Sequence, residues 1–318
     1  MAISCHFILP FPGNTTMPNS TEDDNFLGSL SEQWEVFYWT NAIISLLGCM
    51  ENGVVIWLLG FRIKRNPFSI YILNLAVADF SFLLCSFCLS IFNLAEDEFY
   101  TPSTYQVMEL TQILSAFGYN TGLYLLTAIS VERCLAVLVP IWYKCCRSKH
   151  QSPIVCGLIW VLSFLVTPME TITDTLCPAV YLASNIVHCS VFIPLMVLSS
   201  SFLVVKLRKT TLRCPSSQLY LVIISSVVLF LFCAMPCRIL YVFMTIYYTD
   251  LLYMLYPIAI LLSSLNSSIN PLIYLFVGSR KETRFRDSIK VVLTRALVDD
   301  VGSDHQAVST SDSHNTAC

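Results

Sequence analysis

Residues Phe68–Phe92 form an almost unbroken apolar run, FSIYILNLAVADFSFLLCSFCLSIF. Asp79 is the only charged residue in this run, which is longer than the roughly 20 residues that a helix needs to cross a bilayer. Lipid offers the backbone no hydrogen-bond partners, so a single segment that crosses it must satisfy its own peptide groups as a helix. The run therefore predicts a transmembrane helix.

Six more runs of the same kind predict that the chain crosses the membrane seven times in all. They are Tyr38–Gly60, Val107–Leu138, Pro153–Thr173, Pro178–Val205, Gln218–Tyr247 and Leu251–Val277. The 318 residues are 55% apolar and 12% charged, with a mean hydropathy of +0.66, whereas soluble domains carry about 25% charged residues. These values argue against a soluble enzyme, a disordered chain and a nucleic-acid-binding protein. The predicted fold is an all-α membrane protein, a bundle of seven transmembrane helices.

The basic residues predict the orientation of this bundle, because loops rich in Lys and Arg stay in the cytoplasm. Of the 18 Lys and Arg residues, all but Arg238 lie in or beside the segments that follow the first, third, fifth and seventh spans. An N-terminal segment, residues 1–37, is therefore expected outside the cell, and a C-terminal segment, residues 278–318, in the cytoplasm. The bundle itself occupies residues 38–277, and we predict a multi-pass protein of the plasma membrane.

The segments on the predicted outer side agree with this orientation. Asn14 and Asn19 each begin a sequon for N-glycosylation in the N-terminal segment, and such sites are used outside the cytoplasm. The outer segments carry acidic residues and no Lys or Arg. An acidic face raises the local concentration of cations, but acidic residues there also aid translocation and solubility. Both explanations are open.

The 14 cysteines do not predict a disulfide framework, because most lie within spans or on the predicted cytoplasmic side. Cys5 and Cys177 are expected outside, where they could form a bridge. The 5 histidines show no metal-ligand spacing, and the chain contains no metalloprotease, nucleophile-elbow or phosphate-loop motif. Neither an enzymatic activity nor a cofactor is predicted.

Polar and ionisable side chains recur at membrane depth, where each charge costs about 2.5–3.5 kcal/mol on insertion scales. Such residues mark functional networks, or they join helices to one another. They are Glu51, Asn52, Asp79, Glu132, Arg133, Glu170, Arg238, Asn266 and Asn270. Pro194, Pro236 and Pro271 each remove one helical hydrogen bond and predict kinks in the later spans. Kinked helices around a buried acid have the parts of a two-state switch.

Several short motifs, each on its own span, resemble the rhodopsin-like (class A) G-protein-coupled receptors. They are Asn52, Leu75-Ala76-Val77-Ala78-Asp79, Glu132-Arg133-Cys134, Trp160, Pro236 and Asn270-Pro271-Leu272-Ile273-Tyr274. Their order along the chain, over about residues 38–297, makes the resemblance specific.

Departures from the general pattern make the chain most similar to the Mas-related receptors. Met108 replaces a cysteine of the third span, Ala234 replaces the tryptophan of the sixth, and Cys134 replaces the tyrosine of the Asp-Arg-Tyr motif. In these receptors a cysteine that ends the fourth span commonly bridges one that begins the fifth. Cys177 matches the second of these positions, but Asp174 stands at the first, which puts the bridge in doubt.

The resemblance implies a heterotrimeric G protein as the cytoplasmic partner. In the resting state Glu132 would hold Arg133 at the inner end of the bundle. When the sixth span swings outward about Pro236, Arg133 and Tyr274 would line a cavity for the partner. The full predicted switch consists of Asn52, Asp79, Glu132, Arg133, Pro236, Asn270, Pro271 and Tyr274.

The resemblance also implies a polar hub at mid-membrane, formed by Asp79 with Asn266 and Asn270. Related receptors hold a sodium ion at this place. Gly122 stands where a serine ligand is usual, so weak sodium binding is expected, and no other metal site is predicted. Asn52 is explained equally well as a residue that joins helices.

The predicted ligand site lies beneath the acidic outer face. Ser115 occupies the position where receptors for small amines carry an aspartate, which argues against such ligands. Glu170 and Asp174, one helical turn apart, would suit a cationic ligand such as a basic peptide. Arg238 leaves two alternatives open, because it could clamp a ligand carboxylate or pair with Glu170.

The C-terminal segment predicts an amphipathic helix over residues 279–297, whose basic residues can meet anionic membrane lipid. The serine-rich end is expected to be disordered. Receptor kinases could phosphorylate it and so recruit an arrestin, or the tail could be solvated without a regulatory role. Two other functions stay open: a transporter or channel, and an orphan or scaffold receptor that does not signal. The chain lacks the internal repeats of transporters and a polar path for a pore.

Overall fold

The computed structural model describes residues 21–63, 66–95, 101–139, 143, 145, 148, 150–209, 217–247 and 249–279. These described residues are helical apart from short connections, and they contain no strand. The predicted glycosylation sites Asn14 and Asn19, the cysteine Cys5, and the chain beyond Ser279 lie outside them.

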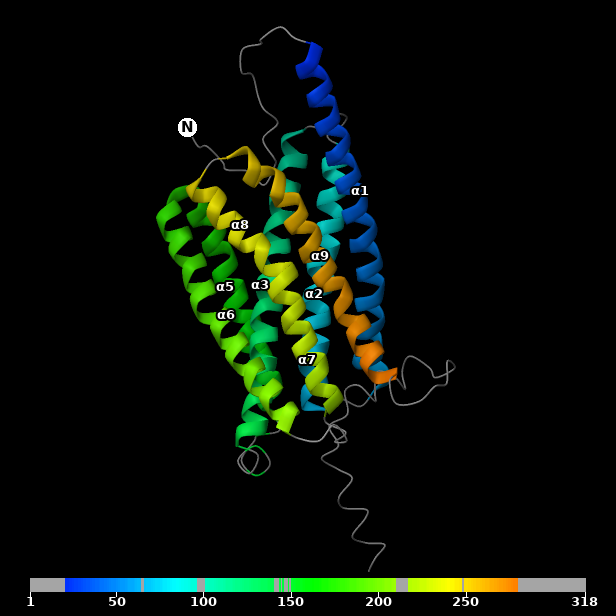
Figure 1. The fold of residues 1–318 in the computed structure, drawn as a ribbon, viewed down its shortest axis with the longest axis vertical. Coiled ribbons are helices and arrows are strands. Elements are labelled where there is room, and N and C mark those ends of the chain that lie inside the picture. Colours follow the sequence, from blue (N-terminus) through cyan, green and yellow to red (C-terminus); the bar gives the residue numbers. More distant parts are fainter. Residues whose placement is uncertain are drawn as a thin grey trace, which may run out of the picture.

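The helices run side by side along the long axis of the molecule (Figure 1). In chain order they are α1 (Thr21–Trp57), η1 (Leu58–Arg62), α2 (Pro67–Leu94), α3 (Pro102–Leu138), α5 (Gln151–Leu176), α6 (Pro178–Lys209), α7 (Ser217–Leu229), η2 (Phe230–Ala234), α8 (Met235–Ile246) and α9 (Asp250–Ser279). The π-helical turn η1 continues α1, and the π-helical turn η2 joins α7 to α8. Counted with these junctions, the described chain forms the seven helical rods that the sequence predicts.

Six of the described helical stretches are long and apolar enough to cross a membrane: Trp34–Arg62, Pro67–Leu94, Pro102–Leu138, Gln151–Ile172, Ala179–Val205 and Leu221–Ile246. The helix α9 packs against α1, α2, α7 and α8 and completes the bundle. The first helix begins earlier than predicted, at Thr21 instead of Tyr38.

Capping residues explain where two of the helices begin. Before α2, the side chain of Asn66 accepts a hydrogen bond from the backbone N–H of Ser69 at 2.6 Å, and the Ser69 hydroxyl accepts one from the backbone N–H of Asn66 at 2.8 Å. Before α3, the hydroxyl of Thr101 accepts from the backbone N–H of Thr104 at 3.2 Å. A proline follows each cap, at the one helical position where its missing N–H costs nothing.

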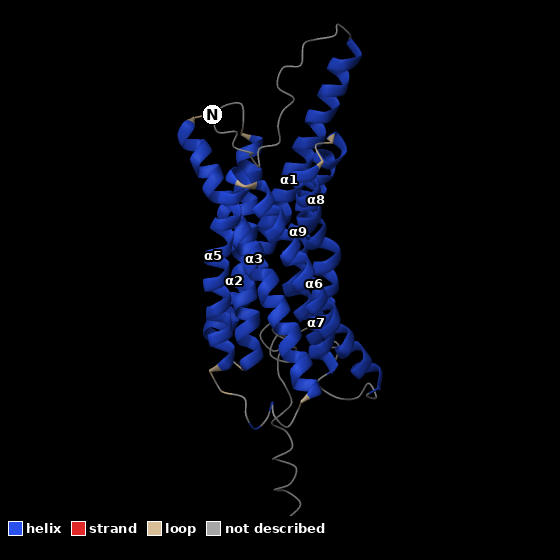
Figure 2. Ribbon diagram, turned by 90° about the vertical axis from the view of Figure 1, so that its left-hand side faces the viewer, coloured by secondary structure: helices blue, strands red, loops and turns tan. Residues whose placement is uncertain are grey.

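The third helix, α3, lies at the centre of the bundle, in contact with α2, α5, α6 and α7. Its residues Leu123 and Leu125 are fully buried, as is Met196 of α6. By contrast, large apolar side chains such as Phe164 and Phe232 are exposed on the outside of the bundle, as expected where lipid rather than water surrounds the helices. The side view shows the described loop residues at the ends of the helices (Figure 2).

The prolines differ in their effect on the helices. α6 and α9 continue as α-helix through Pro194 and Pro271. Pro236 lies in the first turn of α8, directly after the π-helical turn η2. A π-helical turn inserts an extra residue and often marks a functional site. The sixth rod is therefore irregular at the place where the sequence predicts a hinge.

Gly118 lets α3 approach α2 closely. A Cβ atom at Gly118 would lie 2.9 Å from the backbone nitrogen of Phe82 and 3.0 Å from the backbone oxygen of Ala78. Both are backbone atoms of α2, so the two helices would have to separate. We expect Gly118→Ala to lower stability by about 1–3 kcal/mol, measured by thermal melting of the purified protein.

Gly157 of α5 provides the matched control, because no atom lies within 4 Å of a Cβ placed there. Gly157→Ala should leave the melting temperature unchanged or raise it slightly, since alanine favours helix. Equal melting temperatures for the two alanine variants would contradict the close approach of α2 and α3.

Candidate functional site

A cavity of about 500 Å³ lies among α1, α2, α3, α5, α6, α8 and α9. It occupies the half of the bundle in which α2 ends and α3 begins, which we call the acidic half after the acidic segments of the sequence. The volume is within the range of about 300–1,000 Å³ typical of pockets for small ligands. Tyrosine side chains from α1, α3, α6, α8 and α9 line it together with a few charged and amide groups.

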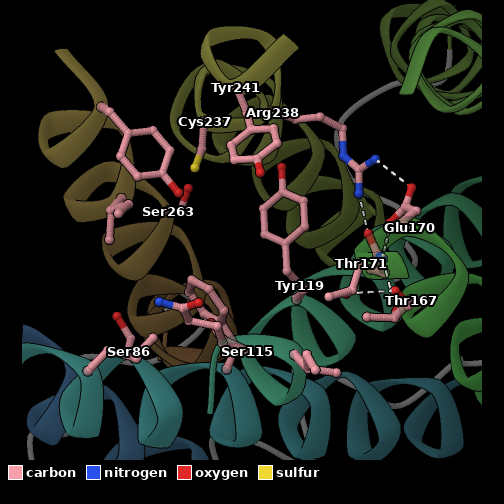
Figure 3. Close-up of a pocket in the computed structure, with 18 of the residues that line it drawn as sticks. Ser86, Ser115, Tyr119, Thr167, Glu170, Thr171, Cys237, Arg238, Tyr241 and Ser263 are labelled. Atoms are coloured by element: carbon pink, nitrogen blue, oxygen red, sulfur yellow. Dashed lines mark hydrogen bonds and ion pairs between the residues drawn. The ribbon is translucent and has the colours of Figure 1, made fainter. Parts of the chain in front are cut away.

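Two opposite charges lie at the inner wall of this cavity. Nη1 of Arg238, on α8, is 3.3 Å from Oε1 of Glu170, on α5. Their exposed fractions are 9% and 7%. Figure 3 shows the Arg238 guanidinium between Glu170 on one side and the rings of Tyr119 and Tyr241 on the other. Of the two alternatives that the sequence left open for Arg238, the pair with Glu170 is the one that the structure contains.

Amide side chains hold both members of this pair. Arg238 donates through Nη1 to Oδ1 of Asn185 at 2.8 Å, and through Nη2 to Oδ1 of Asn120. Asn120 in turn donates to Oε2 of Glu170 at 3.0 Å and to the hydroxyl of Thr167 at 3.1 Å. Each buried charge is thus paired and hydrogen-bonded, which is the condition under which a protein interior tolerates it.

His188 of α6 extends the network toward α3. Its Nδ1 lies 3.0 Å from Oε1 of Glu170 and its Nε2 lies 2.6 Å from the hydroxyl of Tyr124. The same Nδ1 lies 3.1 Å from Nη1 of Arg238, so His188 contacts both members of the ion pair. These contacts join α3, α5, α6 and α8 into one connected unit.

The remaining residues of the predicted outer site are described by the structure to different extents. Ser115 lines the cavity from α3. Asp174 belongs to α5, but its side chain lies outside the described residues. Cys177 is exposed between α5 and α6, and its proposed partner Cys5 is likewise not described.

Asn120, Asn185 and His188 were not among the predicted site residues. A signal for two of them was present, because Asn185 and His188 lie three residues apart in a span without Asp, Glu, Lys or Arg, and this spacing places them on one face of a helix. Asn120 gave no such signal, since its partners come from helices distant in the sequence.

Tyr119 connects the cavity to the irregular part of the sixth rod. Its hydroxyl donates to the backbone oxygen of Ala234, in η2, at 2.9 Å. Its ring lies 6.2 Å from the ring of Phe230, also in η2, and 5.7 Å from the guanidinium carbon of Arg238. Tyr119 thus contacts η2 at Ala234, whose own side chain is only a methyl group.

The predicted polar hub lies deeper in the bundle. Asp79 is 5% exposed, and its Oδ2 accepts from Nδ2 of Asn270 at 2.8 Å. The side-chain oxygens of Asn266 and Asn270 have no hydrogen-bond partner among the described residues. A carboxylate and two amide oxygens fit the preference of a hard cation such as sodium for oxygen ligands. Gly122 has no side chain to add a ligand, although a Cβ there would lie only 3.9 Å from Oδ1 of Asp79.

Asn52 joins helices, as one of its two explanations predicted. Its side-chain nitrogen donates to the backbone oxygen of Gly48 at 2.9 Å and to that of Ser267 at 3.1 Å. The second bond ties α1 to α9 beside the hub.

Arg133 and Glu132 lie at the opposite end of α3 from the cavity. Both are buried, with exposed fractions of 3% and 6%. The guanidinium carbon of Arg133 is 4.4 Å from the ring centroid of Phe68, and Oε1 of Glu132 accepts from the hydroxyl of Tyr143 at 2.9 Å. The ion pair between Glu132 and Arg133 remains a prediction, and the side chain of Tyr274 lies outside the described residues.

Comparison with known proteins agrees with this arrangement. A family model described as "7 transmembrane receptor (rhodopsin family)" matches residues 51–274. Proto-oncogene Mas of Rattus norvegicus is 47% identical over 298 residues, 89% of this chain and 90% of the relative. Mas of Homo sapiens is 46% identical over 310 residues, with shares of 93% and 92%.

Mas-related G-protein coupled receptor member H of Mus musculus is 40% identical over 301 residues, which cover 90% of this chain and 92% of the relative. The motifs of the sequence are most similar to Mas and to member H, and both are among these relatives. They are receptors, in agreement with the prediction that the chain is not an enzyme. The chain belongs to the rhodopsin family of seven-transmembrane receptors and, within it, to the Mas-related receptors.

Proposed function

We propose that the receptor carries the binding of an extracellular ligand across the plasma membrane to a heterotrimeric G protein. The observation that carries this proposal is the placement of two sites on one central helix. Asn120 of α3 lies at the inner wall of the cavity, and Arg133 lies 13 residues further along the same helix, or about 20 Å at 1.5 Å per residue. A ligand and a G protein could therefore act on opposite ends of α3.

The orientation and the domain boundaries belong to the same proposal. Residues 1–37 lie outside the cell and carry glycans at Asn14 and Asn19, whereas residues 278–318 lie in the cytoplasm. The amphipathic segment 279–297 rests on the inner membrane surface. Receptor kinases phosphorylate the tail beyond it, and an arrestin binds the phosphorylated tail. Protease accessibility of both termini in intact cells tests the orientation directly.

The proposed ligand is a basic peptide that enters the cavity from the acidic side. Acidic residues around the opening raise the local concentration of cations. Ser115 lines the path, Glu170 and Arg238 form the wall that the peptide meets at depth, and Asp174 lies one turn beyond Glu170 on α5. A sodium ion bound weakly by Asp79, Asn266 and Asn270 would stabilise the resting arrangement of the hub.

Agonist-dependent nucleotide exchange on a purified G protein tests the proposed function. The receptor is reconstituted in vesicles, a peptide library is applied, and exchange is compared with solute or ion flux through the same vesicles. Exchange without flux supports the receptor function. Flux without exchange would instead support a transporter or channel, and neither response to any peptide would favour an orphan or scaffold protein.

Replacement of Tyr119 by Phe tests how the cavity communicates with the sixth rod. Tyr119→Phe keeps the ring and removes the hydrogen bond to Ala234. Loss of this bond should free η2 and raise ligand-independent nucleotide exchange by about twofold to tenfold, which corresponds to the usual net worth of one hydrogen bond. Exchange is measured per receptor at equal surface expression.

Thr121→Val is the matched control on the same helix. The Thr121 hydroxyl donates to the backbone oxygen of Phe117 within α3 at 2.7 Å, and its removal should not alter basal exchange. A rise in both variants would attribute the effect to α3 itself and contradict a specific role of the contact with Ala234.

A further inference from the structure

Among the described residues, three acidic or basic side chains line the cavity. They are Glu109 and Glu170, both acidic, and Arg238, which is basic. In the described part of the lining, the acidic side chains thus outnumber the basic ones by one. The contacts of the two carboxylates show which of them carries this excess negative charge.

The carboxylate of Glu170 is already occupied. Its Oε1 accepts from Arg238 at 3.3 Å and from the hydroxyl of Ser184 at 3.3 Å, and it lies 3.0 Å from Nδ1 of His188. Its Oε2 accepts from Asn120 at 3.0 Å. A carboxylate has about four lone-pair sites, and four polar groups already surround Glu170, so a ligand cation at Glu170 would compete with them. The pair with Arg238 also leaves this region without net charge.

Glu109 has the opposite character. It is exposed, it lines the cavity from the second turn of α3, and its carboxylate has no ion-pair partner in the described part of the chain. The residues Glu109, Gln112, Ala116 and Tyr119 lie at helical spacing on the face of α3 that lines the cavity. The uncompensated charge of the lining is thus located at Glu109, near the start of the helix.

Two amide side chains beside the cavity can assist at this place. Gln112 lies one turn after Glu109 and also lines the cavity. Asn93, near the end of α2, lines it as well, and its nitrogen is used by the backbone oxygen of Leu89 at 2.7 Å, which leaves its side-chain oxygen to accept. An ammonium or guanidinium group has several N–H donors, and a carboxylate with amide oxygens is a suitable set of acceptors.

We infer that Glu109, rather than Glu170, binds the cationic group of the ligand. This inference rests on the proposed function, in which the cavity takes a basic peptide, and it assigns the peptide's Lys or Arg side chain to the outer part of the cavity. Glu109 precedes Asn120 by 11 residues on α3, or about 16 Å. A peptide of about five extended residues could span that distance, with its uncharged end at the Glu170–Arg238 wall.

Matched peptide pairs test this assignment. The probe is a library of N-acetylated, C-amidated hexapeptides in which every member with one Lys has a twin with norleucine at that position. Purified receptor in nanodiscs of neutral lipid, without G protein, is incubated with the library, and retained peptides are quantified by mass spectrometry. Acetylation and amidation remove the charges of the peptide termini, and the two members of a pair differ in charge only at the Lys position.

The wild-type receptor should retain its best Lys peptides about fivefold more strongly than their norleucine twins, as for an ion pair at an accessible site. Glu109→Gln should bring this ratio to about one, whereas Glu109→Asp should preserve part of it. Glu35→Gln is the matched control, because Glu35 is an exposed acid of α1 in the same half of the bundle that does not line the cavity. It should keep the wild-type ratio.

Three results would overturn the inference: an unchanged ratio in Glu109→Gln, an equal loss in Glu35→Gln, or no preference for Lys in the wild-type receptor. The equal loss would assign the preference to the general acidic field. Since binding is measured without a G protein, a failure of the proposed coupling would leave the result intact. Conversely, peptide-driven exchange with an unchanged ratio would remove only the role of Glu109.

Discussion

Arg133→Ala is expected to abolish ligand-driven nucleotide exchange while the receptor still reaches the cell surface. Arg133 is 3% exposed and its guanidinium packs over the ring of Phe68, at the end of α3 away from the cavity. Arg133 has no contact with the cavity, so the ligand should bind the variant. The substitution would remove the guanidinium group, which we propose faces the G protein after the sixth rod moves.

Exchange is measured in membranes that contain equal numbers of receptors, counted by staining of an N-terminal epitope on intact cells. Arg62→Ala is the control, because Arg62 is an exposed cation of η1 that also packs on an aromatic ring, with 5.4 Å between its guanidinium carbon and the centroid of Trp57. It should retain coupling. Undiminished exchange in Arg133→Ala would refute the proposed role of this residue.

Arg238→Gln is expected to give the largest loss of stability of any single substitution in the cavity wall. The change removes the cation and leaves the carboxylate of Glu170 buried without its charge partner. Breaking a buried ion pair from one side costs about 3–5 kcal/mol, because the remaining charge is uncompensated. The purified receptor should therefore melt at a clearly lower temperature and express poorly.

The double variant Glu170→Gln with Arg238→Gln distinguishes loss of charge balance from loss of packing. It contains two neutral amides of similar size to the original side chains, and it should recover most of the stability lost in Arg238→Gln. A double-mutant cycle built from the melting data then gives the coupling between the two residues. If the double variant were as unstable as the sum of the single variants, Glu170 and Arg238 would not stabilise each other.

The membrane spans followed from the sequence because lipid imposes one requirement on every segment that crosses it. Each peptide group must find its partner within the same helix, so length and apolar composition are enough to locate a helix such as Phe68–Phe92. The buried polar residues were visible for the same reason. An Asp79 or an Arg238 in an apolar span stands out before any partner is known, since its burial carries a cost.

The partners themselves did not follow from the sequence. Arg238 could clamp a ligand or bind Glu170, and the choice depends on how α5 and α8 are rotated about their axes. Asn120, 118 residues before Arg238 in the chain, joins the network only because α3 turns one face toward α5. The bond from Tyr119 to Ala234 depends in addition on η2, a π-helical turn that exposes a backbone oxygen and that no residue pattern announced.

Composition and local spacing thus established the helices, their number and their predicted orientation, because these depend on interactions between neighbouring residues and the solvent. The hydrogen-bonded state of Glu170 and the lack of an ion-pair partner for Glu109 among the described residues emerged from packing alone. Both are acids near the outer ends of predicted spans, and the sequence assigned Glu170, not Glu109, to the ligand site. The rotation and the depth of each helix surround Glu170 with four polar partners and leave Glu109 at the edge of the cavity.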